Sequence, residues 1–217
     1  MIDDSINHEY IIRYIRDVLP ESDGLLHELE EFAAENEVPI SQPETIRLLE
    51  VLIRLSGRKK ILELGSAIGY SAVRMANAGG GTVDTIEINH EAASYAKRVF
   101  DKAGLSDRIT LYEGDANEIL PMLSEQGKKY DMIFIDAAKA QYNNFFEYCY
   151  NMLESGGLLV SDNILYKGMT ATDDLVLHRK RTIVKRLRDY VSMLCTHNGL
   201  DTTVIPVGDG IALSVKK

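Results

Sequence analysis

The sequence predicts an α/β protein with a mostly parallel sheet, and three features of its hydrophobic pattern support this. After residue 57, apolar runs of strand length alternate with amphipathic stretches of helix length. Such alternation is typical of a parallel sheet covered by helices on both faces. The last two apolar runs have only the turn-rich PVGDG between them, which favours an antiparallel hairpin. Before residue 58, the pattern has helical periodicity alone.

The expected elements follow one another along the whole chain. Helices are expected first, because apolar residues recur at helical spacing over 11–19, 25–33 and 46–55. Strands are then expected at 60–64, 82–86, 108–112, 131–135, 157–161, 201–206 and 210–215. The helices between them are expected at 69–78, 89–103, 116–124, 141–153 and 174–196, with Asn89 and Asp115 as N-caps. Because no repeat or linker-like tract interrupts the pattern, we interpret the chain as one domain, with a helical N-terminal part (1–57) and a sheet-containing core (58–217).

The composition limits the class of protein. Hydrophobic residues make up 45% and charged residues 26% of the chain, which is ordinary for a soluble globular protein. No apolar run approaches the roughly 20 residues of a membrane span, and the acidic start MIDDSINHEY does not resemble a secretory signal. We therefore expect a cytoplasmic protein without membrane association, with Cys149 and Cys195 as reduced thiols. The net charge of −9 disfavours a general nucleic-acid binder, although the stretch 178–188 is rich in Lys and Arg and contains no acid.

The ends of the first three strands carry glycines or acids. The first strand runs into ELGSAIGYS, where Gly65 and Gly69 bracket a turn that lets the backbone and a helix N-terminus approach a ligand. The second strand ends at Glu87, an acid placed to accept hydrogen bonds from ribose hydroxyls. The third runs into Asp115 and Ala116, near the expected place of an adenine. Together these ends indicate a nucleoside cofactor. The glycine spacing favours S-adenosylmethionine over NAD, whose binders typically carry G-x-G-x-x-G.

The next two strands end in oxygen-bearing side chains. The fourth strand ends at Asp136, with Lys139 three residues later, and the fifth ends at Asp162 and Asn163. Neighbouring parallel strands would bring the two carboxylates and the amide together. This set suits a hard divalent ion such as Mg²⁺, with positions left for water or substrate oxygens. From the spacing alone, a hydrogen-bonded strand edge fits as well as a metal site.

The motifs ELGSAIGYS, TIEIN, GDA, DAAKAQY and SDNILYKG, in this order, resemble the cation-dependent class I O-methyltransferases, which include catechol and caffeoyl-CoA methyltransferases. The resemblance covers nearly the whole chain and implies a Rossmann-like class I methyltransferase fold with a seven-stranded sheet and extra N-terminal helices. EVPI, DAAKAQYNNFF, DNILYKG and PVGDGIALS are most similar to the bacterial branch that converts 5-hydroxyuridine to 5-methoxyuridine at the wobble position of tRNA. The resemblance thus implies S-adenosylmethionine and Mg²⁺ or another divalent cation as cofactors, a tRNA anticodon stem-loop as substrate, and a homodimer.

The resemblance also implies roles for individual residues. The implied metal ligands are Asp136, Asp162 and Asn163, and Lys139 is implied as the catalytic base or orienting cation. The implied cofactor-binding residues are Val38, Glu63, Gly65, Tyr70, Ser71, Glu87, Asp115, Ala116 and Asp136. Ala137 and Ala138 stand where the catechol enzymes carry bulky residues, which implies a roomier entrance for the acceptor.

Arg181, Lys185 and Arg188 line one face of the expected 174–196 helix, either as a ridge that contacts tRNA phosphates or as a solvated surface. Tyr166 is a candidate for stacking on a base. Other functions are also considered. A small catechol-like or hydroxycinnamoyl acceptor would keep the same chemistry. An NAD-dependent oxidoreductase is disfavoured by the missing G-x-G-x-x-G, and a non-catalytic nucleoside-binding module would have no use for Lys139 and the metal set.

Overall fold

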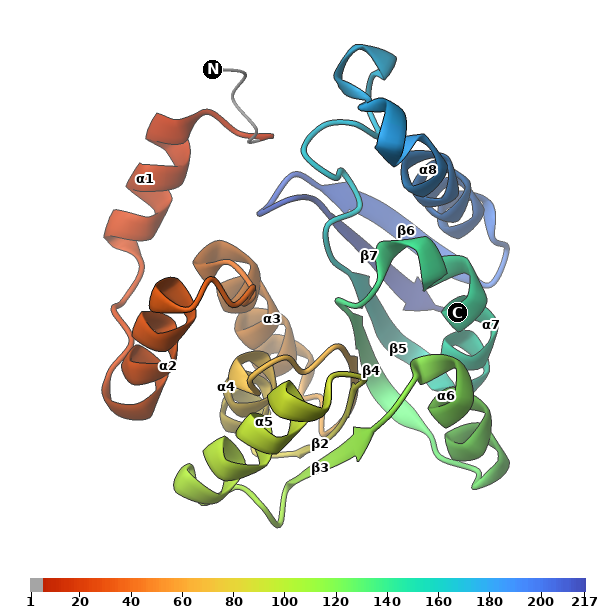
Figure 1. The fold of residues 1–217 in the computed structure, drawn as a ribbon. Coiled ribbons are helices and arrows are strands. Elements are labelled where there is room, and N and C mark those ends of the chain that lie inside the picture. The colour runs from red at the N-terminus through yellow and green to blue at the C-terminus, as the bar shows by residue number, and fades with distance from the viewer. Residues whose placement is uncertain (1–5) are drawn as a thin grey trace.

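A computed structural model describes residues 6–217, so the first half of the acidic N-terminal stretch, residues 1–5, lies outside the described residues. Its centre is a seven-stranded sheet in the order β3-β2-β1-β4-β5-β7-β6 (Figure 1). The strands are β1 Lys60–Leu64, β2 Thr82–Glu87, β3 Ile109–Glu113, β4 Tyr130–Ile135, β5 Leu153–Ser161, β6 Leu200–Ile205 and β7 Ile211–Lys216. The first five strands pair in parallel, and β7 pairs antiparallel with both β5 and β6. The predicted mostly parallel sheet with a C-terminal hairpin is therefore confirmed.

Helices cover both faces of the sheet (Figure 1). One face packs against α2 (Gly24–Glu35), α3 (Pro43–Ser56), α4 (Tyr70–Gly79) and α5 (His90–Lys102). The other face packs against α6 (Ala116–Glu125), α7 (Tyr142–Met152) and α8 (Arg181–Thr196). Successive residues of a strand point to opposite faces, so Ile61 joins the first core and Leu62 the second. Both faces of β1 and β4 are thus buried, as their continuous apolar runs require.

The N-terminal helices are less buried than their periodicity suggests. No residue of α1 (Glu9–Val18) is buried, and Tyr10 and Tyr14 are 69% and 68% exposed. In α3 the buried apolar stripe is Ile46, Leu49 and Ile53, whereas Leu55, which was expected on that face, is 82% exposed. Periodicity identifies the apolar face of a helix, but it does not show whether another element covers that face.

The predicted helix over 174–196 begins seven residues later, at Arg181. Two short 3-10 turns, Asp173–Leu175 and His178–Lys180, precede it. The Thr172 hydroxyl accepts the N–H of Asp174, and Leu177 has an extended backbone, so a local cap replaces the first helical turns. Within residues 6–217, no helix has the length and apolar character to cross a membrane.

Candidate active site

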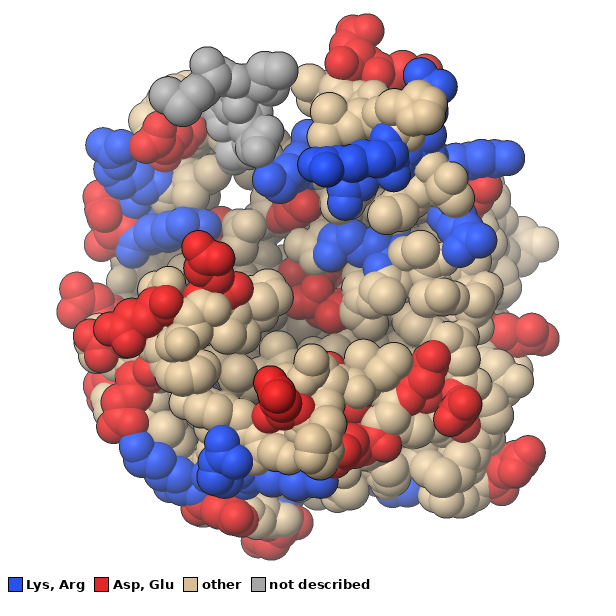
Figure 2. Space-filling view, viewed as in Figure 1, with Lys and Arg blue, Asp and Glu red and all other residues tan. Residues whose placement is uncertain are grey.

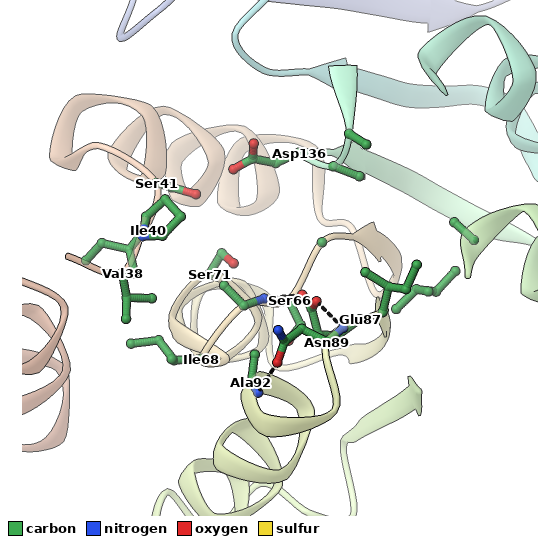
Figure 3. Close-up of a pocket in the computed structure, with 18 of the residues that line it drawn as sticks. Val38, Ile40, Ser41, Ser66, Ile68, Ser71, Glu87, Asn89, Ala92 and Asp136 are labelled. Atoms are coloured by element: carbon green, nitrogen blue, oxygen red, sulfur yellow. Dashed lines mark hydrogen bonds between the residues drawn. The ribbon is translucent and has the colours of Figure 1, made fainter. Parts of the chain in front are cut away.

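A cavity of about 1110 Å³ lies beyond the carboxyl ends of the parallel strands. The segments that follow β1 to β5 all line it, together with residues 38–42 and part of α5. Ligands bind at this place in open α/β sheets. Eleven of the predicted cofactor, metal and catalytic residues line it, namely Val38, Gly65, Tyr70, Ser71, Glu87, Asp115, Ala116, Asp136, Lys139, Asp162 and Asn163. The structure therefore gathers them into one site, shown in part in Figure 3.

The turn after β1 requires both of its glycines. Gly65 has a φ of +100°, and a side chain there would collide with the backbone carbonyl of Asp136. Gly69 has a φ of +88°, and a Cβ would lie 2.6 Å from a ring carbon of Phe100. Residues with a side chain rarely adopt this conformation. Glycine at position 65 thus lets the turn lie against the end of β4 at Asp136, and glycine at position 69 lets it lie against α5.

Backbone N–H groups orient the acids of β2 and β3. One carboxylate oxygen of Glu87 accepts the N–H of Ala67 and the other accepts the N–H of Asn89, both at 2.8 Å. The Asn89 side chain accepts the N–H of Ala92 at 2.9 Å and caps α5 (Figure 3). The Asp115 side chain accepts the N–H of Asn117 at 2.8 Å and caps α6. Both predicted N-caps are confirmed, and Glu87 is held in place where it faces the cavity.

Glu63 lies behind the cavity wall and, unlike the other predicted cofactor residues, does not line the cavity. Its Oε2 accepts the hydroxyl of Thr85 at 2.6 Å. The carboxylate also lies within hydrogen-bond reach of the Ser71 hydroxyl. The hydroxyl of Ser66, which lines the cavity, is buried without a hydrogen-bond partner among the described residues. Burial raises the pKa of Glu63 to about 7. Unpartnered buried polar atoms are uncommon, so this end of the site is prepared for a polar ligand.

Tyr70 contributes to the wall of the cavity, while its hydroxyl points into a polar network. The hydroxyl donates to Glu30 at 2.5 Å and accepts from Arg74 at 2.9 Å. Burial and the bond to Glu30 raise the pKa of Tyr70, which keeps the phenol protonated. Tyr70 therefore joins α2 to the start of α4, where Ser71 also lines the cavity.

The predicted metal ligands form an acidic group at the ends of β4 and β5. Asp162 is 2% exposed and accepts the N–H of Asn163 at 2.6 Å. Burial, and then repulsion from Asp136, raise the pKa of Asp162 to about 8. Burial also raises the pKa of Asp136, against the opposing effects of Lys139 and a hydrogen bond from Ser41. Two acids therefore face each other with too little positive charge nearby to stabilise both as carboxylates.

Some residues of the site were missed by sequence reasoning. Ser41, directly after EVPI, lies in the cavity near Asp136, and no motif or spacing points to it (Figure 3). Phe32 and Tyr95 stack at 4.6 Å between ring centroids across the cavity mouth from α2 to α5. Asp209 of PVGDG accepts the N–H of Lys167 at 2.5 Å. Burial raises the pKa of Asp209, against the opposing effects of this hydrogen bond and of the charge of Lys139. Asp209 lies within the PVGDG motif, but the sequence alone gave no reason to assign it a function.

The predicted basic ridge divides into two groups. Arg181 and Lys185 are exposed. Arg188 is half-buried and hydrogen-bonds the carbonyls of Met169 and Thr170. The candidate stacking residue Tyr166 is part-exposed, with the ammonium of Lys180 5.6 Å from its ring centroid.

Comparison with known proteins agrees with this geometry. The family model described as O-methyltransferase matches residues 18–217. A catechol O-methyltransferase from Niastella koreensis is 34% identical over 96% of this chain and 97% of its own. The solved structure of a candidate caffeoyl-CoA O-methyltransferase from Staphylococcus aureus has a TM-score of 0.89 and 36% identity, and the match covers 96% of this chain and 100% of that one. An O-methyltransferase from Bacillus cereus, solved with S-adenosylhomocysteine, has a TM-score of 0.85 and 26% identity over 96% of this chain and 97% of that one.

These structures define the fold as that of the class I methyltransferases. The chain belongs to the O-methyltransferase family and is an S-adenosylmethionine-dependent O-methyltransferase. The cavity fits this cofactor. Glu87 and Asp115 offer carboxylate oxygens that can accept hydrogen bonds from a ribose and an adenine, and the unpartnered hydroxyl of Ser66 is available to another polar group of the cofactor.

The acidic group also fits a divalent cation. Two carboxylates and an amide oxygen are donors that Mg²⁺ prefers, and a positive ion between Asp136 and Asp162 would relieve the repulsion that raises the pKa of Asp162. Within residues 6–217, no cluster contains three or more His, Cys, Asp or Glu placed to hold a metal. Three oxygen ligands from Asp136, Asp162 and Asn163 would leave positions for water and for acceptor oxygens.

Proposed function

We propose that the protein methylates the 5-hydroxyl of 5-hydroxyuridine at the wobble position of tRNA, with S-adenosylmethionine as methyl donor and Mg²⁺ as the divalent cation. The observation that carries this proposal is the basic surface at the edge of the cavity. Figure 2 shows Lys and Arg side chains along the side of the central hollow where α8 begins, with acidic side chains inside the hollow. Arg179, Arg181 and Lys185 are among the exposed cations that this part of the chain offers to a polyanion.

The charge distribution supports an RNA substrate. The chain has a net charge of −9, so most of its surface would repel nucleic acid. A basic patch beside the cavity of an acidic protein directs a polyanion toward that cavity. The patch borders the cavity, because Arg186 of α8 donates to the carbonyl of Ala140, next to Lys139. A wobble nucleotide in a single-stranded loop could enter there while phosphates contact the patch.

The chemistry follows from the residues at the ends of β4 and β5. Asp136, Asp162 and Asn163 would hold the cation, which when bound would orient two neighbouring acceptor oxygens and stabilise negative charge on the attacking one. In 5-hydroxyuridine these are the 5-hydroxyl and the O4 carbonyl. Lys139 can accept the hydroxyl proton if it is neutral, or stabilise the oxyanion if it is charged. Ala137 and Ala138 line the cavity and leave room for a nucleotide. Much of the acceleration would come from holding the hydroxyl in line with the methyl group.

A small catechol-like or hydroxycinnamoyl acceptor is the second candidate. The observation that favours it is the 34% identity to the catechol O-methyltransferase of Niastella koreensis. Both candidates need two adjacent oxygens beside the same acids, so they differ in whether the basic patch takes part.

The test is methyl transfer from labelled S-adenosylmethionine to tRNA carrying 5-hydroxyuridine and, in parallel, to catechol, each with Mg²⁺ and with a chelator. We expect transfer to tRNA that is lost with the chelator. In the double charge reversal R181E/K185E, tRNA affinity should fall and the slope of log affinity against log salt should flatten by roughly 1 to 2. Transfer to catechol alone, with no response to the charge reversal, would favour the second candidate.

Homodimerisation and a cytoplasmic location stay predictions. For a dimer, the exposed apolar side chains Tyr10, Tyr14 and Val18 of α1 are available as contacts.

A further inference from the structure

The inward side of the basic stretch holds the loop that follows the predicted metal ligands. Arg188 donates from Nε to the carbonyl of Thr170 at 3.0 Å and from Nη2 to the carbonyl of Met169 at 3.1 Å. Its Nη1 pairs with Asp173 at 2.7 Å. All three bonds go to the segment that leads away from Asn163. A planar guanidinium can make this forked set of bonds, whereas the ammonium of a lysine cannot.

The same part of α8 also holds the segment that carries Lys139. Arg186 donates from Nη1 to the carbonyl of Ala140 at 3.0 Å, and its own carbonyl accepts from the Asn143 side chain at 2.9 Å. Ala140 lies in the 3-10 turn Lys139–Gln141. The exposed Arg186 and the half-buried Arg188 of α8 therefore contact the two segments that carry Lys139 and Asn163.

The loop after Asn163 needs such support, because its backbone is strained. Asn163, Tyr166 and Lys167 have φ values of +57°, +45° and +56°. Left-handed conformations of residues other than glycine cost of order 1–3 kcal/mol each and persist only where the surroundings hold them. The PVGDG turn supports one side of the loop, since Asp209 accepts from the backbone of Lys167 and Leu165. Arg188 supports the other side.

We propose that Arg188, assisted by Arg186, is a positioning residue that keeps Asn163 and Lys139 in the geometry that catalysis requires. The basic stretch of α8 then has two roles. Arg181 and Lys185 serve the acceptor, and Arg186 and Arg188, which donate to backbone carbonyls, serve the active-site backbone. The inference rests on the proposed roles of Asn163 and Lys139, but it does not depend on whether the acceptor is RNA or a catechol.

The test compares R188K and R188Q with the wild type. Mn²⁺ is the metal probe, its binding followed by electron paramagnetic resonance, and methyl transfer is measured with whichever acceptor the parallel assay identifies. We expect both variants to weaken Mn²⁺ affinity and to lower kcat by roughly 10- to 100-fold, as loss of outer-shell partners does at other metal sites. KM for the acceptor should change by less than about threefold, because Arg181 and Lys185 would supply the acceptor contacts. R186Q, which loses one bond, should show a smaller effect in the same direction.

The lysine variant separates geometry from charge. If Arg188 acts by its forked hydrogen bonds, R188K behaves like R188Q. If Arg188 contacts a phosphate as a cation, R188K behaves like the wild type and R188Q raises KM, which overturns the inference. K185Q is the matched comparison on the same helix. It should raise KM for tRNA and leave Mn²⁺ affinity unchanged.

Two further outcomes keep the inference apart from the proposed function. If the wild type binds Mn²⁺ and R188Q has the same Mn²⁺ affinity and the same kcat, the positioning role is overturned and the proposed metal site is unaffected. Absence of Mn²⁺ binding by the wild type overturns the proposed metal site and this inference with it. Circular dichroism and thermal unfolding of each variant show whether it is folded. If the Arg188 variants are misfolded, the Mn²⁺ affinity and kcat of the milder R186Q test the inference.

Discussion

On the β1–β3 side of the cavity, most polar side chains are paired with backbone groups, whereas on the β4–β5 side several charged groups lack full compensation. Glu87 accepts two backbone N–H groups, and Asn89 and Asp115 each cap a helix. By contrast, Asp136 and Asp162 both have raised pKa values because they are buried close together. The loop that begins at Asn163 has three left-handed backbone positions outside glycine, against one, Ala67, in the turn after β1.

This difference indicates how the two sides reach their working state. The cofactor side is largely complete once the chain has folded, because local hydrogen bonds already orient its acids. The acceptor side holds uncompensated charge and backbone strain, which a bound cation and acceptor would relieve. Perturbed acids in a cavity are typical of functional sites, so the less stable side is where we place the chemistry.

The largest expected effect comes from D162N, which changes the acceptor side alone. It replaces one proposed carboxylate ligand by a neutral amide and removes one of two repelling charges, while it keeps the shape of the side chain. We expect methyl transfer to fall at least about 1000-fold, because a lost metal interaction is worth several kcal/mol. The melting temperature should stay the same or rise, because the variant removes a buried acid whose pKa is raised first by burial and then by repulsion from Asp136.

The measurements for D162N are kcat/KM over a Mg²⁺ titration and thermal unfolding. Calorimetric binding of S-adenosylhomocysteine is the control, and it should be retained, since Asp162 is not among the proposed cofactor-binding residues. Wild-type turnover in D162N would remove Asp162 from the metal set and would make the two sides of the cavity alike.

Glu63 is the exception on the cofactor side, and pH tests it. Its pKa is raised from 4.5 to about 7 by burial, so the folded state binds the proton more tightly than the unfolded state. Its contribution to stability is therefore fully present below pH 4.5 and is lost as the pH rises through about 7. E63Q should lack this pH dependence. Its unfolding free energy should therefore decrease between pH 5 and pH 8 by up to about 3 kcal/mol less than that of the wild type.

Denaturant unfolding of wild type and E63Q at several pH values checks this expectation. The difference between the two proteins cancels the contributions of Asp136 and Asp162, which shift in the same direction. If the unfolding free energies of wild type and E63Q change with pH in parallel, the raised pKa of Glu63 is contradicted. Glu63 would then resemble the other polar residues of the cofactor side.

Much of the architecture and of the site could be predicted from the sequence, for a physical reason. Parallel strands end at the same edge of a sheet, so acids at strand ends, such as Glu87, Asp136 and Asp162, had to meet there. Contacts between distant segments could not be predicted. Ser41 reaches Asp136 from a loop far away in the sequence, and no spacing rule connects them.

The basic helix shows the same limit. Its composition predicted a cationic surface, but whether a given arginine faces solvent or a carbonyl depends on what packs beside the helix. Arg188 faces the carbonyls of Met169 and Thr170, which the pattern of charges does not reveal. The start of the helix also depended on a competing local cap at Thr172.

The smallest expected effect comes from N89A, which tests the cofactor side at its most local level. The Asn89 side chain caps α5 through the N–H of Ala92, and loss of such a cap costs about 1 kcal/mol. The backbone N–H of Asn89 still donates to Glu87 in the variant, so Glu87 should keep its orientation. N89A should therefore melt a few degrees lower and bind S-adenosylhomocysteine almost as well as the wild type. In N89S another capping side chain should restore the stability. If N89A instead loses cofactor affinity more than tenfold while N89S regains only stability, the Asn89 side chain contributes to the cofactor site itself, and the cofactor side is no more complete on folding than the acceptor side.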